Sequence, residues 1–255
     1  MPNTMIVMPT YNEADNLPLI IEAIFDLQID GLQVLIVDDN SPDGTGEIAD
    51  RLAAQYEGQI FVLHREGKAG LGPAYIAGFK KAITLGADYI MQMDADFSHQ
   101  PKYIPQLIAE IESGYDMVIA SRFAKGGGVD ESWGVYRKLL SWFANRVYVP
   151  SILGLPIRDA TGGFRIWRRN TLIGLDLDRV RANGYVFQVE LTYIAYRLGF
   201  KIEEIPIYFP DRTRGESKMD IRIQREAALR VLQMRWRHRH LTPQQRRTEA
   251  YHAMQ

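Results

Sequence analysis

The chain has 255 residues, of which 46% are hydrophobic and 24% are charged, a balance typical of a globular protein and not of a disordered one. It contains no cysteine, which excludes disulfides and cysteine-ligated zinc, and it has no run of about 18 apolar residues that would predict a membrane span. The formal net charge of −1 hides an asymmetry, because residues 212–255 hold 11 Lys and Arg against four Asp and Glu. Such a basic end suits a phospholipid surface, a nucleic acid or an anionic substrate, or is simply a solvated tail.

Short apolar runs alternate with helical patterns through the first 120 residues. We expect strands at 5–8, 34–37, 60–63, 89–93 and 117–120, and helices at 17–27, 46–56, 74–85 and 101–112. This alternation predicts βαβ units, hence a mainly parallel sheet with helices on both faces. Sheets of this kind bind ligands in the crevice at the carboxyl ends of their strands.

Three of the expected strands end in polar clusters: PTYNE (9–13), DDNSPDG (38–44) and DADFSH (94–99). In an extended chain, side chains two residues apart point the same way, roughly 6–7 Å apart, so Asp94 and Asp96 can converge on one cation. Paired carboxylates favour Mg²⁺ or Mn²⁺, which also bind phosphate oxygens. The alternative is a turn whose carboxylates only cap the next helix. His99 is interpreted as a turn residue.

The pattern is weaker after residue 122. The glycine-rich segment 124–131 indicates either a surface linker or a close approach of the backbone. Residues 139–157 are apolar but interrupted by Asn145, Arg146 and two prolines, so they indicate buried core or an interfacial segment and not a membrane span. Residues 159–169 read as a turn followed by an arginine-rich strand or helix start, and 202–209 alternate like a strand.

Residues 221–237 predict a basic amphipathic helix. A helical projection separates two faces. One holds Arg222, Glu226, Arg230, Gln233 and Arg237, and the other holds Ile221, Ala228, Leu229, Leu232 and Trp236. Such a helix suits a membrane surface, the protein core or a partner.

The three clusters, in this order, resemble the family-2 glycosyltransferases, whose nucleotide-sugar fold is called GT-A. The motifs are MPTYNEADNLP (8–18), VDDNSPDGT (37–45) and MDADFSHQP (93–101). Five further motifs are similar to those of dolichyl-phosphate (polyprenol-phosphate) mannosyltransferases: SRF (121–123), RKLLS (137–141), DATGGFR (159–165), GYVFQVE (184–190) and DRTRGESKM (211–219).

The resemblance implies an α/β GT-A domain at 1–220, with a mostly parallel, twisted, Rossmann-like sheet flanked by helices. The basic amphipathic helix and tail then occupy 221–255. The implied reaction is a metal-dependent, inverting transfer of mannose from GDP-mannose to a polyprenyl monophosphate. The alternatives are UDP-glucose or another nucleotide sugar as donor to polyprenyl phosphate or a glycan, and a non-catalytic nucleotide-sugar-binding subunit. Nucleic-acid binding through the basic tail ranks below these, and no nucleic-acid partner is expected.

The resemblance also implies roles for single positions. The guanosine part is expected to lie against Pro9, Tyr11, Glu13, Val37 and Asp39. The diphosphate and the Mg²⁺ or Mn²⁺ ion are expected at Asp94, Ala95 and Asp96. In this interpretation Asp96 binds the ion directly and Asp94 acts through ribose or water. Ser98 stands where some relatives have a metal-binding glutamine, so it is not expected to bind the ion.

Four basic positions and one hydroxyl complete the expected site. The resemblance implies that Arg122, Arg212 and Lys218 bind the donor phosphates and line the acceptor pocket. Arg137 and Ser141 match positions that contact the lipid phosphate in some relatives. A long lipid acceptor requires membrane access. We therefore expect peripheral attachment at the cytoplasmic face through the basic tail and residues 139–157, with or without a membrane-anchored partner subunit.

Overall fold

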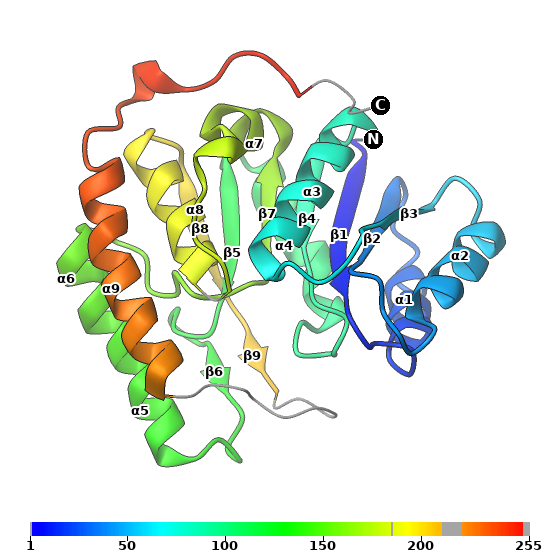
Figure 1. Cartoon of the computed structure of the whole chain (residues 1–255), viewed down its shortest axis with the longest axis horizontal. Helices are drawn as coiled ribbons and strands as arrows, with labels where there is room; N and C mark the ends of the chain where they lie inside the picture. The colour runs from blue at the N-terminus through cyan, green and yellow to red at the C-terminus, as the bar shows by residue number, and fades with distance from the viewer. Residues whose placement is uncertain (1, 185, 211–220, 252–255) are drawn as a thin grey trace.

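The computed structural model describes residues 2–184, 186–210 and 221–251, with side chains from 227 onward in the last range. Its main sheet has seven strands in the order β3-β2-β1-β4-β7-β5-β8, and a small parallel ribbon pairs β6 with β9 (Figure 1). The strands are β1 (Thr4–Thr10), β2 (Leu32–Asp38), β3 (Ile60–His64), β4 (Tyr89–Gln92), β5 (Met117–Ser121), β6 (Gly128–Val129), β7 (Arg165–Arg168), β8 (Ile202–Pro206) and β9 (Tyr208–Phe209).

Helices cover both faces of the sheet. They are α1 (Leu17–Phe25), α2 (Thr45–Gln55), α3 (Leu71–Thr84), α4 (Ile104–Glu112), α5 (Val135–Phe143), a π-helix (Ala144–Tyr148), α6 (Val149–Leu153), α7 (Arg169–Leu175), α8 (Val186–Arg197) and α9 (Ile221–His238). Short 3-10 turns lie at Pro101–Tyr103, Leu177–Arg179 and Pro243–Gln245.

Alternating side chains of the strands divide the interior into two cores. Met5 and Val7 of β1 join α3, α6, α7, α8 and α9 on one face, and Ile6 and Met8 join α1, α2 and α4 on the other. Both pairs are fully buried, as expected for a central parallel strand covered on both faces. The predicted α/β architecture with a mostly parallel sheet is therefore confirmed.

One strand breaks the parallel pattern. Strand β7 pairs antiparallel with both β4 and β5, so β5 runs in the same direction as β4. Arg165, the first residue of β7, is completely buried, and burial lowers the pKa of its guanidinium to about 9. Its nitrogens donate to the carbonyl oxygens of Ala160, Gly162 and Gln188. The strand thereby holds the preceding loop, residues 159–164, against α8.

Helix α9 packs through a face that lies between the two predicted ones. Val231, Met234 and His238 are buried, whereas Leu229, Leu232 and Trp236 are 61%, 46% and 74% exposed. Leu229, Leu232 and Trp236 of the predicted apolar face therefore point outward. The tail after α9 lies along the body: Arg246 donates to the carbonyl oxygens of Leu198 and Gly199, and Arg247 binds Asp176.

The segment 135–153 lies partly at the surface and partly in the core. Helix α5 contributes no buried residue, whereas Val149 and Leu153 of α6 belong to the larger core. The interpretation as buried core is thus confirmed for α6, and the interfacial interpretation of the exposed α5 stays a prediction. No helix in the described ranges combines the length and the apolar content that crossing a membrane requires.

Candidate functional site

The three polar clusters lie together at one edge of the sheet. Strands β2, β1 and β4 are parallel neighbours, and β1 is flanked by β2 on one side and by β4 on the other. The chain order reverses direction between β1 and β4, which is where open α/β sheets bind ligands. Strand β5 ends at the same edge and leads into Arg122. In Figure 1 this edge, here called the rim, is the lower edge of the sheet.

Each of the three clusters holds a residue in an unfavourable backbone conformation. Asn12, Asn40 and Phe97 have φ angles of 62°, 56° and 61°. These lie in the left-handed region, which residues other than glycine rarely adopt. Asparagine tolerates this region, but for phenylalanine it is a clear outlier. Backbone strain of this kind concentrates at binding and catalytic sites, so the rim is a candidate functional site on conformation alone.

Hydrogen bonds join the first two clusters into one surface. The backbone N–H of Glu13 donates to the Thr45 hydroxyl at 2.9 Å, and that of Asn12 donates to the Ser41 hydroxyl at 3.2 Å. Pro9 and Val37 are register partners on β1 and β2. Val37 is fully buried, whereas Pro9 is partly exposed at the rim.

Two basic side chains from the loop after β3 reach this surface. Arg65 makes a short ion pair with Asp39, and Lys68 Nζ lies 3.8 Å from the centre of the Tyr11 ring. Burial raises the pKa of Asp39, although the Arg65 charge acts in the opposite direction. Arg65 and Lys68 lie in the loop between β3 and α3, and the structure brings that loop to Tyr11 and Asp39.

Asp94 is held by Tyr75, from outside its own motif, and by His99, from within it. The Tyr75 hydroxyl, on α3, donates to Asp94 Oδ1 at 2.7 Å, and the Asp94 backbone N–H donates to His99 Nδ1 at 2.8 Å. Tyr75 is completely buried, and burial, followed by the charges of Asp94 and Asp96, raises its pKa well above 10. Tyr75 is therefore a permanent donor, and both carboxylates lie close enough to affect it. Nothing in the pattern of α3 distinguishes Tyr75 from an ordinary core aromatic residue.

His99 lies in the bend that follows β4, as expected of a turn residue, but its side chain is buried. It is 3% exposed, and its ring stacks on Phe164 with centroids 5.0 Å apart. Ser98 is also buried, and its hydroxyl donates to Asp96 Oδ1 at 2.5 Å. Ser98 thus orients the carboxylate of Asp96.

Arg122 is fixed by a buried acid that follows the π-helix and α6 in the chain. Its Nε and Nη2 donate to the two oxygens of Asp159 at 2.8 and 2.6 Å, and its backbone N–H donates to the same carboxylate at 2.9 Å. Burial alone would raise the pKa of Asp159, but the charge and hydrogen bonds of Arg122 outweigh it and lower the pKa. In the sequence, Asp159 is only the first residue of the motif DATGGFR (159–165). The structure makes it the counter-ion of Arg122.

Aromatic rings connect Arg122 with Arg137. The Arg122 guanidinium lies 5.4 Å from the Phe209 ring centre, Trp133 meets Phe209 edge-on at 5.9 Å, and the Arg137 guanidinium lies 3.6 Å over Trp133. The loop that carries Trp133 passes close to the end of β5. A Cβ on Gly127 would lie 2.7 Å from the Ser121 carbonyl oxygen, so the glycine-rich segment serves a close approach.

The remaining predicted positions are divided between the rim and the undescribed part of the chain. Ala95 is buried between the two acids, and Ser141 lies on α5 one turn after Arg137. Arg212 and Lys218 lie outside the described residues. Within the described ranges, no cluster of three or more His, Asp or Glu side chains is arranged to hold a metal ion. The rim thus offers a pair of carboxylates flanked by cations, which suits an ion shared with an anionic ligand.

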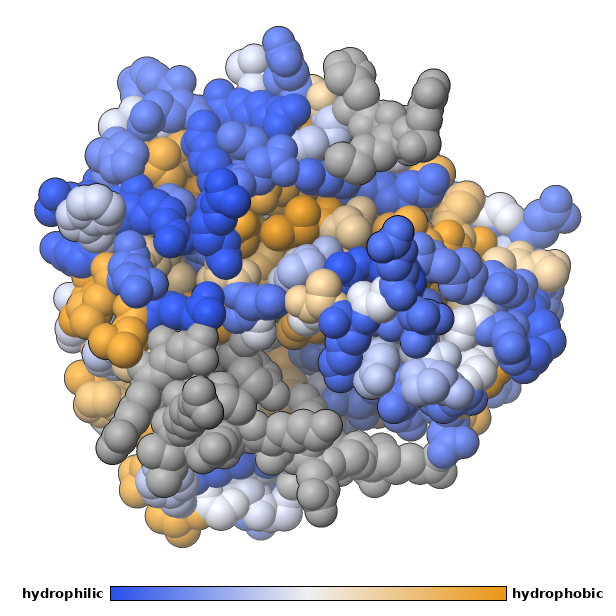
Figure 2. Space-filling model, in the orientation of Figure 1, coloured by the Kyte–Doolittle hydropathy of each residue, from blue (hydrophilic) through white to orange (hydrophobic). Residues whose placement is uncertain are grey.

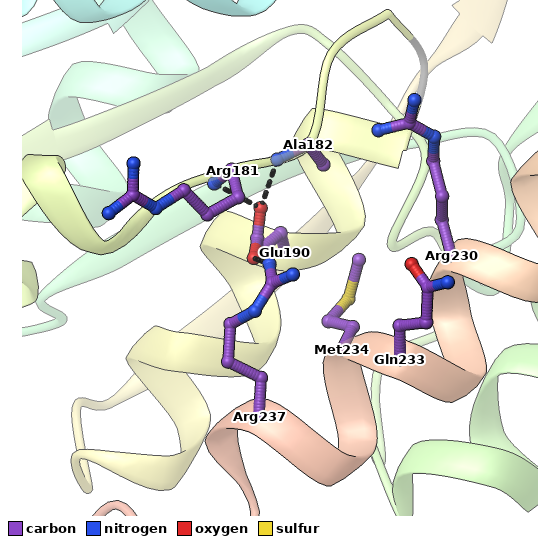
Figure 3. Close-up of a pocket in the computed structure, with 7 residues that line it drawn as sticks. All are labelled: Arg181, Ala182, Glu190, Arg230, Gln233, Met234 and Arg237. Carbon is purple, nitrogen blue, oxygen red and sulfur yellow. Dashed lines mark hydrogen bonds and ion pairs between the residues drawn. The ribbon is translucent and has the colours of Figure 1, made fainter.

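A small cavity lies between α8 and α9 (Figure 3). Its volume is about 30 Å³, and it is lined by Arg181, Ala182, Glu190, Arg230, Gln233, Met234 and Arg237. The buried Glu190 carboxylate accepts hydrogen bonds from His238 at 2.8 Å and from the backbone N–H groups of Arg181 and Ala182. A cavity of this size holds water but no sugar nucleotide. The contacts of Glu190 with Arg237 and His238 tie α9 to α8.

Comparison with known proteins shows the family of the chain. The model of the family Glycosyl transferase family 2 matches residues 5–174. An undecaprenyl-phosphate mannosyltransferase of Micrococcus luteus is 44% identical over 232 residues, 91% of this chain and 93% of that protein. A polyprenol monophosphomannose synthase of Mycolicibacterium smegmatis is 42% identical over 228 residues, 89% of this chain and 85% of that protein.

Solved structures share the fold at lower identity. The glucosyl-3-phosphoglycerate synthase of Mycobacterium tuberculosis, in complex with Mn²⁺, UDP and phosphoglyceric acid, superposes with a TM-score of 0.63 at 20% identity, covering 92% of this chain and 78% of that one. A second complex of that synthase, with Mn²⁺, UDP-glucose and phosphoglyceric acid, gives 0.61 at 18% identity and covers 92% and 79%. The family match over residues 5–174 and the two relatives at 42–44% identity lead to one conclusion: the chain belongs to glycosyl transferase family 2.

Proposed function

We propose that the protein transfers mannose from GDP-mannose to a polyprenyl monophosphate with inversion at the anomeric carbon. The observation that carries this proposal is the identity of 42–44% over most of both chains to relatives named as mannosyltransferases of polyprenyl phosphates. The rim supports it, because Asp94 and Asp96 follow β4 and Arg122 follows β5, and both strands end at the edge where open α/β sheets bind ligands.

The proposed reaction needs no dedicated general base. A phosphate monoester, whose second pKa is near 6, is already an anionic nucleophile at neutral pH. One of its oxygens bonds to the anomeric carbon as the bond from that carbon to the diphosphate oxygen breaks, and GDP leaves with the electron pair. The difficulty is the repulsion between two anionic phosphates. Four basic side chains are proposed to reduce this repulsion through charge-assisted hydrogen bonds: Arg122, Arg137, Arg212 and Lys218.

The carboxylate pair fits a divalent ion such as Mg²⁺ or Mn²⁺. Two carboxylates supply hard oxygen ligands and leave coordination places for diphosphate and water, as such ions require. The ion would neutralise the departing diphosphate as a Lewis acid. Tyr75 and His99 would hold Asp94, and Ser98 would hold Asp96, in the orientation that binding needs.

A direct assay tests the proposed function. Incubation of the purified protein with labelled GDP-mannose, Mn²⁺ and a polyprenyl phosphate is expected to give lipid-soluble label. Protection in a thermal-shift experiment separates the alternative donors: GDP should stabilise the protein more than UDP. Lipid-soluble label from UDP-glucose alone would favour the alternative donor, and nucleotide binding without any transfer would favour a non-catalytic subunit.

Replacing Tyr75 with phenylalanine should weaken Mn²⁺ binding about tenfold. The change removes the donor to Asp94 Oδ1 but keeps the ring that stacks on Phe187, and loss of a group that orients a metal ligand typically costs 10–100-fold in affinity. The affinity is measured by titration of Mn²⁺ in the presence of GDP. Tyr148→Phe, which loses a hydrogen bond to the Ala228 carbonyl away from the rim, is the control. Equal Mn²⁺ affinity in all three proteins would contradict this role of Tyr75.

We further propose that the protein binds the cytoplasmic face of a membrane through a surface of α5, the π-helix and α9. Six exposed apolar side chains of this lipid-facing surface belong to the first two elements: Val135, Tyr136, Leu139, Trp142, Phe143 and Val147. Three belong to α9: Leu229, Leu232 and Trp236. The elements are neighbours, since the Tyr148 hydroxyl donates to the Ala228 carbonyl. In Figure 2, orange side chains lie along the edge that α5 and α9 occupy in Figure 1.

The composition of the lipid-facing surface suits an anionic bilayer. Trp and Tyr are the residues that membrane interfaces favour, and the exposed Arg146 and Arg239 stand beside them. The described part of the basic tail offers less positive charge to a bilayer, because the side chains of Arg246 and Arg247 already bind protein groups. Helix α5 also carries Arg137 and Ser141, so the same helix would meet both the bilayer and the lipid phosphate.

The double variant Leu232→Glu/Trp236→Glu is expected to lower binding to vesicles containing phosphatidylglycerol at least about tenfold. Burial of one large apolar side chain is worth about 1.5–3 kcal/mol, and 1.4 kcal/mol is a factor of ten. Flotation of the protein with vesicles measures the effect. Leu19→Glu is the matched control, because Leu19 is 51% exposed on α1, at the other end of the sheet. Equal loss in the control would show that added charge alone weakens binding.

A further inference from the structure

The π-helix between α5 and α6 has one buried side chain. Of its five residues, Ala144–Tyr148, only Asn145 is buried, at 1% exposure, and the preceding α5 buries none. A π-helical turn inside a helix is rare and frequently marks a functional site. Asn145 is therefore the point at which this exposed segment enters the interior of the protein.

The amide of Asn145 binds the hydroxyl and the backbone N–H of Thr161. Its Nδ2 donates to Thr161 Oγ1 at 2.9 Å, and its Oδ1 accepts the Thr161 backbone N–H at 3.2 Å. Nδ2 also donates to the Ser141 carbonyl oxygen on α5, at 3.0 Å. Both Nδ2 hydrogens and the amide oxygen are thus used, which fixes the side chain in one orientation.

Thr161 links Asn145 to Arg122. Its hydroxyl accepts from Arg122 Nη2 at 2.8 Å and lies 3.3 Å from Asp159 Oδ1, to which it donates. Asp159 in turn holds the guanidinium through Nε and Nη2. The four residues Asn145, Thr161, Asp159 and Arg122 form a continuous hydrogen-bonded network in a largely buried region, where such networks are strong and specific.

We propose that Asn145 is a positioning residue that fixes α5 relative to Arg122. The inference rests on the proposed function, because α5 carries Arg137 and Ser141 for the acceptor phosphate while Arg122 serves the donor diphosphate. The two phosphates must meet in line, and a misplacement of about 1 Å can cost about 10²-fold in rate. Asn145 keeps the spacing of the two binding groups constant while the outer face of α5 contacts lipid.

The kinetic test uses variants that remove or keep single hydrogen bonds. Asn145→Ala and Thr161→Val are expected to lower kcat about tenfold to a hundredfold and to change the KM for GDP-mannose less than about threefold. Thr161→Ser keeps the hydroxyl and should stay near wild type, as should Ser151→Ala, an exposed control on α6. In an Arg122→Lys background, Asn145→Ala should have less than about a twofold further effect. If Asn145→Ala lowered kcat by the same factor in the Arg122→Lys background as in wild type, the proposal would be overturned.

A spectroscopic readout is independent of the activity. The Nε–H signal of Arg122, assigned by its loss in Arg122→Lys, should be sharp in wild type and in Thr161→Ser. It should broaden or shift in Asn145→Ala and Thr161→Val, because the guanidinium loses its fixed partners. An unchanged signal in both variants would overturn the proposal. Since this signal does not depend on the substrate, it answers the question about Asn145 even if the protein fails to transfer mannose.

Discussion

Replacing Asp96 with asparagine is expected to lower mannose transfer by about 10³-fold or more and to leave the fold intact. The amide keeps the shape of the carboxylate and can still accept the Ser98 hydroxyl, but it lacks the charge that a divalent ion requires. A Lewis acid at a phosphoryl group is worth several kcal/mol, and about 4 kcal/mol corresponds to a factor of about 10³ in rate. Transfer of label from GDP-mannose to polyprenyl phosphate measures the loss.

Two controls make this result specific. Asp26→Asn changes an exposed acid at the end of α1 and should keep the wild-type rate. The melting temperature of Asp96→Asn should lie within a few degrees of wild type, whereas its stabilisation by GDP with Mn²⁺ should be lost. A variant that keeps more than a tenth of the rate would contradict a role of Asp96 in binding the ion.

Removal of the Asp159 carboxylate should destabilise the protein by about 3–5 kcal/mol. Asp159 is completely buried, and its loss leaves the largely buried Arg122 guanidinium without its counter-charge, which is the costly way to break an ion pair. Urea denaturation of Asp159→Ala at neutral pH measures the change. The double variant Arg122→Ala/Asp159→Ala should be more stable than the sum of the two single losses predicts, because no unpaired charge remains.

The pH dependence of this effect has a definite sign. The pKa of Asp159 is lowered in the folded protein, so its charge contributes stability above the ordinary carboxyl pKa of about 3.9, and that contribution disappears as the pH falls through the lowered value. The difference in unfolding free energy between wild type and Asp159→Asn should therefore be largest near pH 7 and should decrease below about pH 4. A gap that stays constant from pH 7 to pH 3 would contradict the charge-based explanation.

The sequence predicted the strands of the first half and the location of the rim. Apolar runs ending in polar turn residues mark parallel strands, and parallel strands bring their ends to one edge. The strand β7 was harder, because a short arginine-rich segment after a glycine turn suits either a strand or a helix. Its antiparallel place between β4 and β5 depends on Arg165, whose burial is stabilised by carbonyl oxygens of the loop before it and of α8.

Contacts across elements were beyond the sequence pattern. Tyr75 and Asp94 are 19 residues apart, and Arg122 and Asp159 are 37 apart, with no periodicity that relates them. In α9 both Met234 and Leu232 are apolar, and only packing against α6 and α8 decides that Met234 is buried and Leu232 exposed. Polarity thus indicated which residues are candidates for the site, and packing decided which residues contact them.

The C-terminal tail has a consequence for the order of events during synthesis. Leu241 and Tyr251 belong to the larger core, and the Leu177 backbone N–H donates to the Tyr251 hydroxyl at 2.5 Å. The ring of Tyr251 also lies 5.3 Å from Lys80 Nζ, on α3 in the first third of the chain. Because a chain emerges from the ribosome with its N-terminus first, this core cannot close until the last described residues have been made. The smaller core on the other face of the sheet, which ends at Phe209, is complete earlier.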